Sequence, residues 1–409
     1  MQVPNRLYAG PEFTESLRLG SRTSRTLMGR MRHAKDQPRL ALPHLRELDG
    51  IRGIAVLLVF FHHVCFTSIQ PQGWNPFIVF LHNIFRYGAS GVDVFFVLSG
   101  FLITSLLIRA RRSSAYYRDV YWKRALRILP VYILCMLGVL LFIPGSKGYV
   151  LLCALFIANF ANVFHVASMG PFWSLAIEEQ FYLIWPTVVR RRSVETLWRW
   201  ALAITLLVWV LRVAAAAIGH HNYFLTFLRC DGLSLGAMIA CRYQQKQNSL
   251  RSRGDVLALL ASILAGIAFC FLGNSITPLE QHTAFGAATS QTGIALICAG
   301  AVGLAIAYTD HRALAPLRSA PLTFLGLISY ALYMVQLYVL RVYDHLRGDL
   351  ATGDTAAYFI RLVASFAITV AVCLLSRYLV ELPALSLRKR VLRHPTESVF
   401  HEPLPVHHQ

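Results

Sequence analysis

The chain of 409 residues is strongly apolar and strongly basic, with 56% hydrophobic residues and a formal net charge of +19. Soluble domains contain about 45–50% apolar residues. Here the apolar residues lie in stretches of about 20 residues, the length of helix that crosses about 30 Å of hydrocarbon. These stretches follow one another from residue 50 to residue 382. The composition therefore excludes an ordinary soluble enzyme.

The charge and the cysteines exclude two further classes of function. The basic residues lie at the ends of apolar stretches, whereas a nucleic-acid-binding protein gathers them on one face. The eight cysteines form no CxxC pair and lie in or beside apolar segments. This pattern is typical of buried thiols and not of a metal site or a disulfide framework. We expect membrane lipids as partners, with no nucleic acid and no metal.

The apolar stretches predict an all-α, polytopic integral membrane protein with about ten transmembrane helices. The predicted spans are residues 51–69, 90–108, 128–144, 173–189, 200–218, 229–241, 255–273, 289–308, 322–344 and 359–380. They lie in one transmembrane domain, 47–390. We expect 1–46 to be a flexible basic cytoplasmic tail and 391–409 to be a second cytoplasmic tail.

One more apolar stretch, 149–164, decides the topology. With ten spans, 30 Lys and Arg residues lie on one side of the membrane and four lie in the loops of the other. The basic side is the cytoplasmic one. An eleventh span would move the clusters at 190–192 and 251–253 to the outside. We therefore predict a re-entrant or interfacial segment, which needs protein or a water-filled cavity to satisfy its backbone.

Ionisable residues inside the predicted spans are costly and indicate a functional site, although structural ion pairs occur. His63 follows Arg52 by eleven positions, which is about 16 Å and about three full turns of helix. Both side chains therefore share one face, and His62 points about 100° away from it. Taken alone, a buried histidine such as His63 is more often structural.

Two further charged pairs stand out. Arg124 and Arg127 are three positions apart at a predicted helix start, so they share a face. Two guanidiniums suit a phosphate-rich ligand, or they anchor the loop at anionic lipid. Glu178 and Glu179 are adjacent in an apolar helix, where they act as acid or base or pair with an arginine of the membrane interior such as Arg212.

Seven motifs together resemble the membrane-bound acyltransferase-3 family, over about residues 47–390. As a set they are specific, although each alone is weak. In chain order they are DGIRGIAVLLVFFHH, GVDVFFVLSGFLIT, KRALRILPVY, FWSLAIEEQFYLIWP, RCDGLSLG, ISYALYMVQLYV and VELPALSLRKR.

The resemblance implies a reaction and a set of residues. Such proteins move an acyl group, commonly acetyl, from cytoplasmic acyl-CoA to a hydroxyl of an extracytoplasmic or lipid-linked saccharide. Acyl-CoA would then be the donor, and a saccharide or glycolipid the acceptor. The motifs assign His63, Arg52, Glu178 and Glu179 to catalysis, Arg124 and Arg127 to acyl-CoA, and Asp93, Ser99, Trp173 and Tyr330 to substrate binding.

The chain also departs from the family pattern. Many members have a histidine near the end of the ISY motif, where this chain has Gln336. Glutamine cannot shuttle a proton, which puts a catalytic role of this position in doubt. Some members carry a fused soluble hydrolase-like domain, which we do not expect here.

The leading hypothesis is an O-acyltransferase of the bacterial inner membrane with both termini in the cytoplasm. His63 would be the general base or a transient acyl carrier, with Glu178 or Glu179 orienting it. One rival is a transporter or flippase for an anionic saccharide, which would use the same charges as a pathway. A second rival is a non-enzymatic partner in glycan assembly. The sequence leaves the oligomeric state open.

Overall fold

A computed structural model describes residues 45–66, 73–219, 224–276, 284–348 and 353–391. Both predicted tails lie almost wholly outside these residues. Within the described ranges the chain forms helices and no strand, which confirms the all-α prediction. The helices are α2 (Arg46–Phe66), α3 (Pro76–Phe85), α4 (Gly91–Ala110), α5 (Tyr116–Phe142), α6 (Lys147–Ala154), α7 (Phe172–Arg191), α8 (Val194–Ala217), α9 (Asp231–Gln245), α10 (Arg253–Ile276), α11 (Ala284–Ala307), α12 (Ala320–Arg347), α13 (Thr355–Ser376) and α14 (Leu382–Val391).

Eight helical stretches of the described chain are long and apolar enough to span a membrane. The predicted spans 173–189 and 229–241 are also helical, as α7 and α9, but they are less apolar or shorter. In α9, 11 of 15 residues are buried. Because protein surrounds this helix, it needs no apolar surface for lipid, which explains its weak hydropathy signal.

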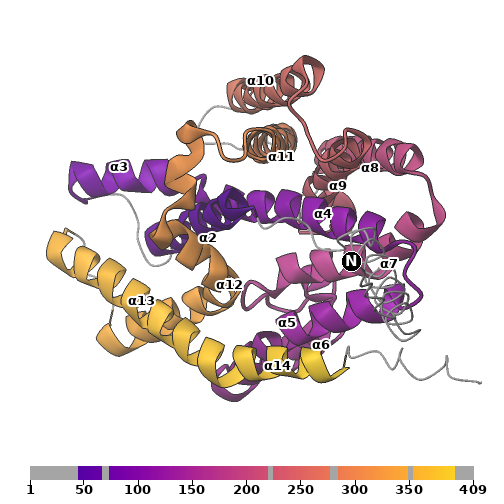
Figure 1. The fold of residues 1–409 in the computed structure, drawn as a ribbon. Coiled ribbons are helices and arrows are strands. Elements are labelled where there is room, and N and C mark those ends of the chain that lie inside the picture. Colours follow the sequence, from indigo (N-terminus) through magenta and orange to yellow (C-terminus); the bar gives the residue numbers. More distant parts are fainter. Residues whose placement is uncertain (1–44, 67–72, 220–223, 277–283, 349–352, 392–409) are drawn as a thin grey trace, which may run out of the picture. The chain divides into compact units, whose positions relative to one another are not determined.

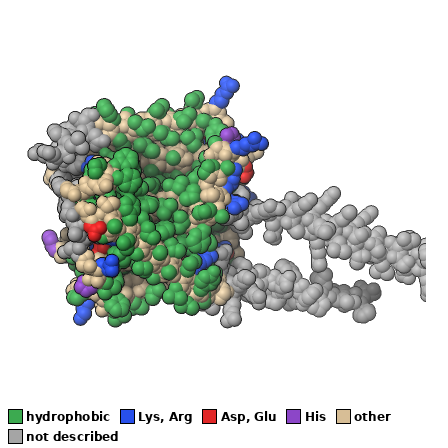
Figure 2. All heavy atoms as spheres, turned by 90° about the vertical axis from the view of Figure 1, so that its left-hand side faces the viewer, with side chains coloured by type: hydrophobic (Ala, Val, Ile, Leu, Met, Phe, Trp, Pro, Cys, Tyr) green, Lys and Arg blue, Asp and Glu red, His purple; other side chains and the backbone are tan. Residues whose placement is uncertain are grey.

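The helices pack around α2, which lies near the centre of the bundle beside α4 and α12 (Figure 1). The pair α10 and α11 forms one edge, and α13 with α14 lies at the opposite side (Figure 1). Figure 2 shows a broad band of hydrophobic side chains on one face of the molecule, with Lys and Arg mostly toward its margins. This surface is the one that a protein in a bilayer presents to lipid.

The segment 149–164 does not form a spanning helix, as predicted. Helix α6 has eight residues, or about 12 Å of length. Positive φ angles at Phe156 (55°) and His165 (54°) then turn the chain. Gln180 of α7 donates Nε2 to the Phe156 carbonyl at 2.7 Å, and Tyr132 of α5 donates its hydroxyl to the Cys153 carbonyl at 2.7 Å. Neighbouring helices thus satisfy the irregular backbone, as a low-dielectric environment requires.

Glycines set the closest helix contacts. A Cβ atom on Gly100 of α4 would lie 2.0 Å from the carbonyl oxygen of Leu233 in α9. A Cβ atom on Gly326 of α12 would lie 1.9 Å from the carbonyl oxygen of Asp49 in α2. In both places a backbone atom occupies the space of a side chain, so only glycine allows the observed approach.

We expect Gly100→Ala to destabilise the protein, because the added methyl group forces α4 and α9 apart. Overpacking of this kind costs about 1–3 kcal/mol. Gly138→Ala in α5 is the matched control, since nothing lies within 4 Å of its Cβ position. This control should be neutral or stabilising by about 0.5–1 kcal/mol. Thermal unfolding of both purified variants measures the difference, and equal midpoints would contradict the packing argument.

Candidate functional site

One face of α2 carries polar residues at both ends and apolar residues between them. Arg52 and His63 are both partly buried. Between them, Val56 is buried in the main core, and Val59 is buried in a cluster joined by Trp173 of α7. This face therefore points into the bundle along about 16 Å of helix, which agrees with the predicted alignment of Arg52 and His63.

Near the end of α2 that carries Asp49 and Arg52, here called the inner end, Arg124 binds both predicted carboxylates; the end that carries His63 is called the outer end. Its Nε donates to Glu179 Oε1 at 2.8 Å, and its Nη2 lies 3.3 Å from Glu178 Oε2. The Tyr182 ring also covers this guanidinium, 3.3 Å from Cζ to the ring centroid. The sequence left pairing with an arginine open as one of two alternatives for these carboxylates, and the structure shows such a pair with Arg124 and not with Arg212.

Arg127 differs from its neighbour Arg124. Its side chain is exposed, and in the described part of the chain it forms no ion pair with a carboxylate. It lies within electrostatic range of Arg52 and Arg124. Arg52 itself pairs with Asp49 at 2.8 Å. Three guanidiniums thus converge near the inner end of α2, and that of Arg127 is open to a ligand.

Two further predicted residues line the same inner site. The Ser99 side chain of α4 lies beside those of Glu178 and Tyr182. The Tyr330 hydroxyl of α12 donates to the carbonyl of Ile128 at 2.9 Å, and its ring lies near Arg124. The structure therefore brings five predicted residues together here: Ser99, Arg124, Glu178, Glu179 and Tyr330.

His62 and His63 stand near the end of α2, eleven positions beyond Arg52 in the case of His63. His62 turns toward α3, where its Nδ1 lies 3.1 Å from the carbonyl oxygen of Phe85. The two histidines thus take different directions, as the helical register predicts. The charged neighbours of His63 are His62 and Arg341. Glu178 in turn interacts with Arg124 and Ser99.

A buried arginine secures the outer end of α2. Arg361 of α13 is 0% exposed and donates Nη1 to the carbonyl of Val64 at 2.8 Å. Its Nε and Nη2 donate to the two carboxylate oxygens of Asp344 at 2.6 and 2.8 Å. The last carbonyls of a helix lack partners within the helix, so Arg361 fixes the turn that carries His63. Sequence reasoning missed this residue, although an arginine inside an apolar stretch was the available signal.

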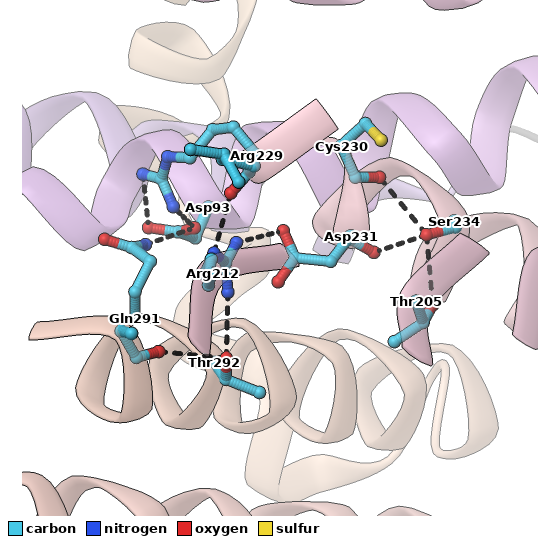
Figure 3. Close-up of polar contacts among 11 residues, drawn as sticks. Asp93, Thr205, Arg212, Arg229, Cys230, Asp231, Ser234, Gln291 and Thr292 are labelled. Atoms are coloured by element: carbon cyan, nitrogen blue, oxygen red, sulfur yellow. Dashed lines mark hydrogen bonds and ion pairs between the residues drawn. The ribbon is translucent and has the colours of Figure 1, made fainter. Parts of the chain in front are cut away.

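A second buried network contains Asp93. Asp93 is 2% exposed, and its Oδ1 and Oδ2 accept from Arg229 at 2.6 and 3.2 Å. Gln291 donates to the same Oδ1 at 3.2 Å. Figure 3 shows how Arg212 lies beside this pair and reaches Asp231 at 2.6 Å. Asp93 of α4 thus connects this helix to Arg229, which precedes α9, and to Gln291 of α11.

Trp173 stands at the start of α7 between this network and the α2 face. Its ring lies 4.7 Å from that of Phe224 and 6.4 Å from that of Phe96, measured between centroids. The Arg229 guanidinium lies 5.9 Å from the Trp173 ring centroid. Trp173 is partly exposed. An aromatic pair of this kind offers an apolar surface with one polar edge.

An apolar groove of about 590 Å³ opens elsewhere, and it does not contain the site. Its lining includes Ile51, Val94 and Val302, and none of the predicted site residues. The described residues also contain no group of three or more potential metal-ligating side chains. The candidate site is therefore the interior face of α2 with its inner and outer polar ends.

We expect Arg212→Met to destabilise the fold strongly, because it leaves the buried Asp231 without its counter-charge. Breaking a buried ion pair on one side costs about 3–5 kcal/mol. The double variant Arg212→Met with Asp231→Asn should recover part of this loss, since neither charge remains. Thermal unfolding of Arg212→Met, of Asp231→Asn and of the double variant tests the pair. A loss of stability in the double variant equal to the sum of the two single-variant losses would argue against the pair.

A known protein family and a relative each match most of the chain. A family model described as an acyltransferase domain matches residues 45–378. The Bacillus subtilis protein YrhL is 28% identical over 322 residues, covering 71% of this chain and 48% of the relative. The peptidoglycan O-acetyltransferase OatA of Listeria monocytogenes is 30% identical over 172 residues, 37% of this chain and 25% of the relative.

A third relative gives the same picture. The O-acetyltransferase OatA of Staphylococcus aureus is 31% identical over 232 residues, covering 48% of this chain and 34% of the relative. The chain thus matches about half or less of the length of these relatives. No solved structure matches.

Proposed function

Since the chain belongs to the acyltransferase-3 family, we propose that it is an O-acyltransferase that carries an acyl group from acyl-CoA to a saccharide hydroxyl. The donor is acetyl-CoA, bound from the cytoplasm. The acceptor is a glycan or lipid-linked saccharide on the other side of the membrane. Relatives named as peptidoglycan O-acetyltransferases support a saccharide acceptor.

The observation that carries this proposal is the separation of the two polar ends of α2. Guanidiniums gather at the inner end, and His63 lies about 16 Å away on the same interior face. Acyl-CoA has a matching arrangement, because its phosphates lie at one end of a long flexible arm and its reactive thioester lies at the other end. The phosphates would bind at the inner end while the thioester reaches His63.

Arg127 is the better candidate for phosphate than Arg124. The guanidinium of Arg124 is occupied by Glu178 and Glu179, whereas that of Arg127 is exposed. Glu178 and Glu179 would then hold Arg124 in position, rather than relay protons to His63. Arg52 lies near Arg127 but is paired with Asp49, so it adds little net charge to the phosphate site.

The chemistry at His63 follows from general base catalysis. Neutral imidazole takes the proton of the acceptor hydroxyl as its oxygen attacks the thioester carbonyl. The tetrahedral intermediate collapses by breaking the carbon–sulfur bond, and the departing CoA sulfur takes up the proton. The products are an O-acyl ester and free CoA. His63 acting first as acyl acceptor would give the same products in two steps.

The orientation of the protein belongs to the same proposal. We place both termini and the basic loops in the cytoplasm, because 30 Lys and Arg residues lie on that side and four in the opposite loops. The protein would then reside in a bacterial inner membrane. Acyl-CoA meets Arg127 from the cytoplasm, and the acceptor approaches His63 from outside.

The donor site is tested by Arg127→Gln, which should raise the KM for acetyl-CoA roughly 10-fold or more through loss of a charged hydrogen bond. Arg127→Lys should also weaken binding, because a point charge lacks the planar fork of the guanidinium. Arg118→Gln is the control, since this arginine is exposed on the same helix α5. Steady-state kinetics decide the matter, and an unchanged donor KM for both Arg127 variants would leave Arg127 as a topology anchor.

The enzymatic proposal itself is tested by comparing two adjacent, chemically equal residues. His63→Ala should lower acyl transfer by about 10²- to 10⁴-fold while the protein still inserts in the membrane. His62→Ala should be milder, because His62 faces Phe85 of α3. Release of CoA from acetyl-CoA by membranes that contain each variant gives the answer. An inactive His62→Ala with an active His63→Ala would refute the register, and full activity of both would favour the transporter.

A further inference from the structure

The outer end of α12 lies beside His63. Leu340 shares a buried cluster with Phe60 and Val64 of α2, and Asp344 is connected to the Val64 carbonyl through Arg361. Residues 340–344 thus lie near residues 60–64. The cation in this stretch is Arg341, which lies within electrostatic range of His63.

Arg341 is available to a ligand. Its side chain is exposed, and its Nη1 donates to the carbonyl of Met169 at 3.3 Å. No carboxylate of the described chain forms an ion pair with it. A guanidinium has five N–H donors in a planar fork, so one carbonyl contact leaves most of them open. Met169 precedes α7, so this contact joins α12 to the segment before the helix that carries Trp173.

The nearest acid on α12 is kept away from Arg341. Asp344 follows it by three positions, a spacing at which opposite charges pair on a helix. Both carboxylate oxygens of Asp344 instead accept hydrogen bonds from Arg361, at 2.6 and 2.8 Å. Arg361 is fully buried, and the Asp344 side chain is 20% exposed. The arrangement neutralises Asp344 and leaves the charge of Arg341 uncompensated.

The location of Arg341 fits the binding of an anionic ligand better than it fits a topology anchor at the lipid headgroups. In the proposed orientation it lies on the outer side, where membrane proteins carry few basic residues. It also lies at the end of the site that the acceptor must enter. An uncompensated guanidinium at this place attracts anions, and carboxylates and phosphates match its fork in two parallel hydrogen bonds.

We propose that Arg341 binds an acidic group, a carboxylate or a phosphate, of the acceptor saccharide. The acceptor class is then acidic glycans, and the ion pair holds a neighbouring hydroxyl at His63. This inference rests on the proposed function, because it takes His63 as the place of acyl transfer. Arg341 acts here as a specificity residue for the acceptor, with no part in donor binding.

The experiment measures binding without any acyl donor. The probes are a soluble peptidoglycan disaccharide with a free lactyl carboxylate and the same disaccharide with that carboxylate converted to a methyl amide. The protein is held in nanodiscs of zwitterionic lipid only, so that lipid phosphate of anionic headgroups does not compete. Wild type, Arg341→Gln and Arg341→Lys are compared. Arg347→Gln is the matched control, because Arg347 is an exposed arginine on the last turn of the same helix.

We expect wild type and Arg347→Gln to bind the acid more tightly than the amide. Arg341→Gln should weaken binding of the acid by about 10- to 100-fold and leave binding of the amide unchanged. Arg341→Lys should retain part of the preference. A wild type that binds neither probe, or binds both equally, overturns the proposal. So does a preference that survives in Arg341→Gln.

Two further readouts separate the alternatives. If Arg341 binds lipid phosphate instead, Arg341→Gln reduces retention of phosphatidylglycerol in mixed nanodiscs and leaves the glycan preference intact, which also overturns the proposal. Release of CoA from acetyl-CoA is measured in parallel on the same samples. Failure of that reaction in wild type counts against the acyltransferase function alone, because the binding comparison uses no donor.

Discussion

A charge inside the bundle must find an opposite charge, and this constraint organises the whole structure. Isolated ions are very costly in a low-dielectric interior. Four arginines satisfy the constraint through carboxylates of other helices or helix ends: Arg124, Arg212, Arg229 and Arg361. Each pair fixes where two segments meet, so the polar residues determine the registry of an otherwise apolar bundle. Arg127 and Arg341, which are exposed and form no such pair among the described residues, lie at the two ends of the α2 face.

The two ends have different physical tasks under the proposed function. The inner end must hold a multiply charged donor, and Arg127 is the guanidinium there that no described carboxylate pairs with, whereas Arg52 and Arg124 are paired. The outer end must bring a hydroxyl, a base and a thioester together, and it places His63 on a helix turn fixed by Arg361. Between the two ends, Val56 and Val59 are buried in the packed core of the bundle. Fixing the base through a buried ion pair limits its motion, and catalysis depends on such positioning.

The sequence predicted the helices and much of the inner site because both depend on local patterns. Hydropathy located the spans, and helical register placed Arg52 with His63. The charge distribution correctly excluded 149–164 as a span. The partner of Glu178 was not predictable in the same way, because Arg124 and Arg212 both lie in helices and only tertiary packing chooses between them. The partners of Asp93 were not predictable for the same reason, since Arg229 and Gln291 lie far along the chain.

The partnership of Asp93 has a consequence for biosynthesis. Arg229 follows Asp93 by 136 residues, and Gln291 follows it by 198. At ribosomal rates of about 5–20 residues per second, the first partner emerges on the order of ten seconds after the acid. During that interval α4 contains a carboxylate with no counter-charge, which opposes its release into lipid. Helix α4 would therefore remain at the insertion machinery, protonated or in contact with water, until the later helices arrive, and the bundle would enter the bilayer largely assembled.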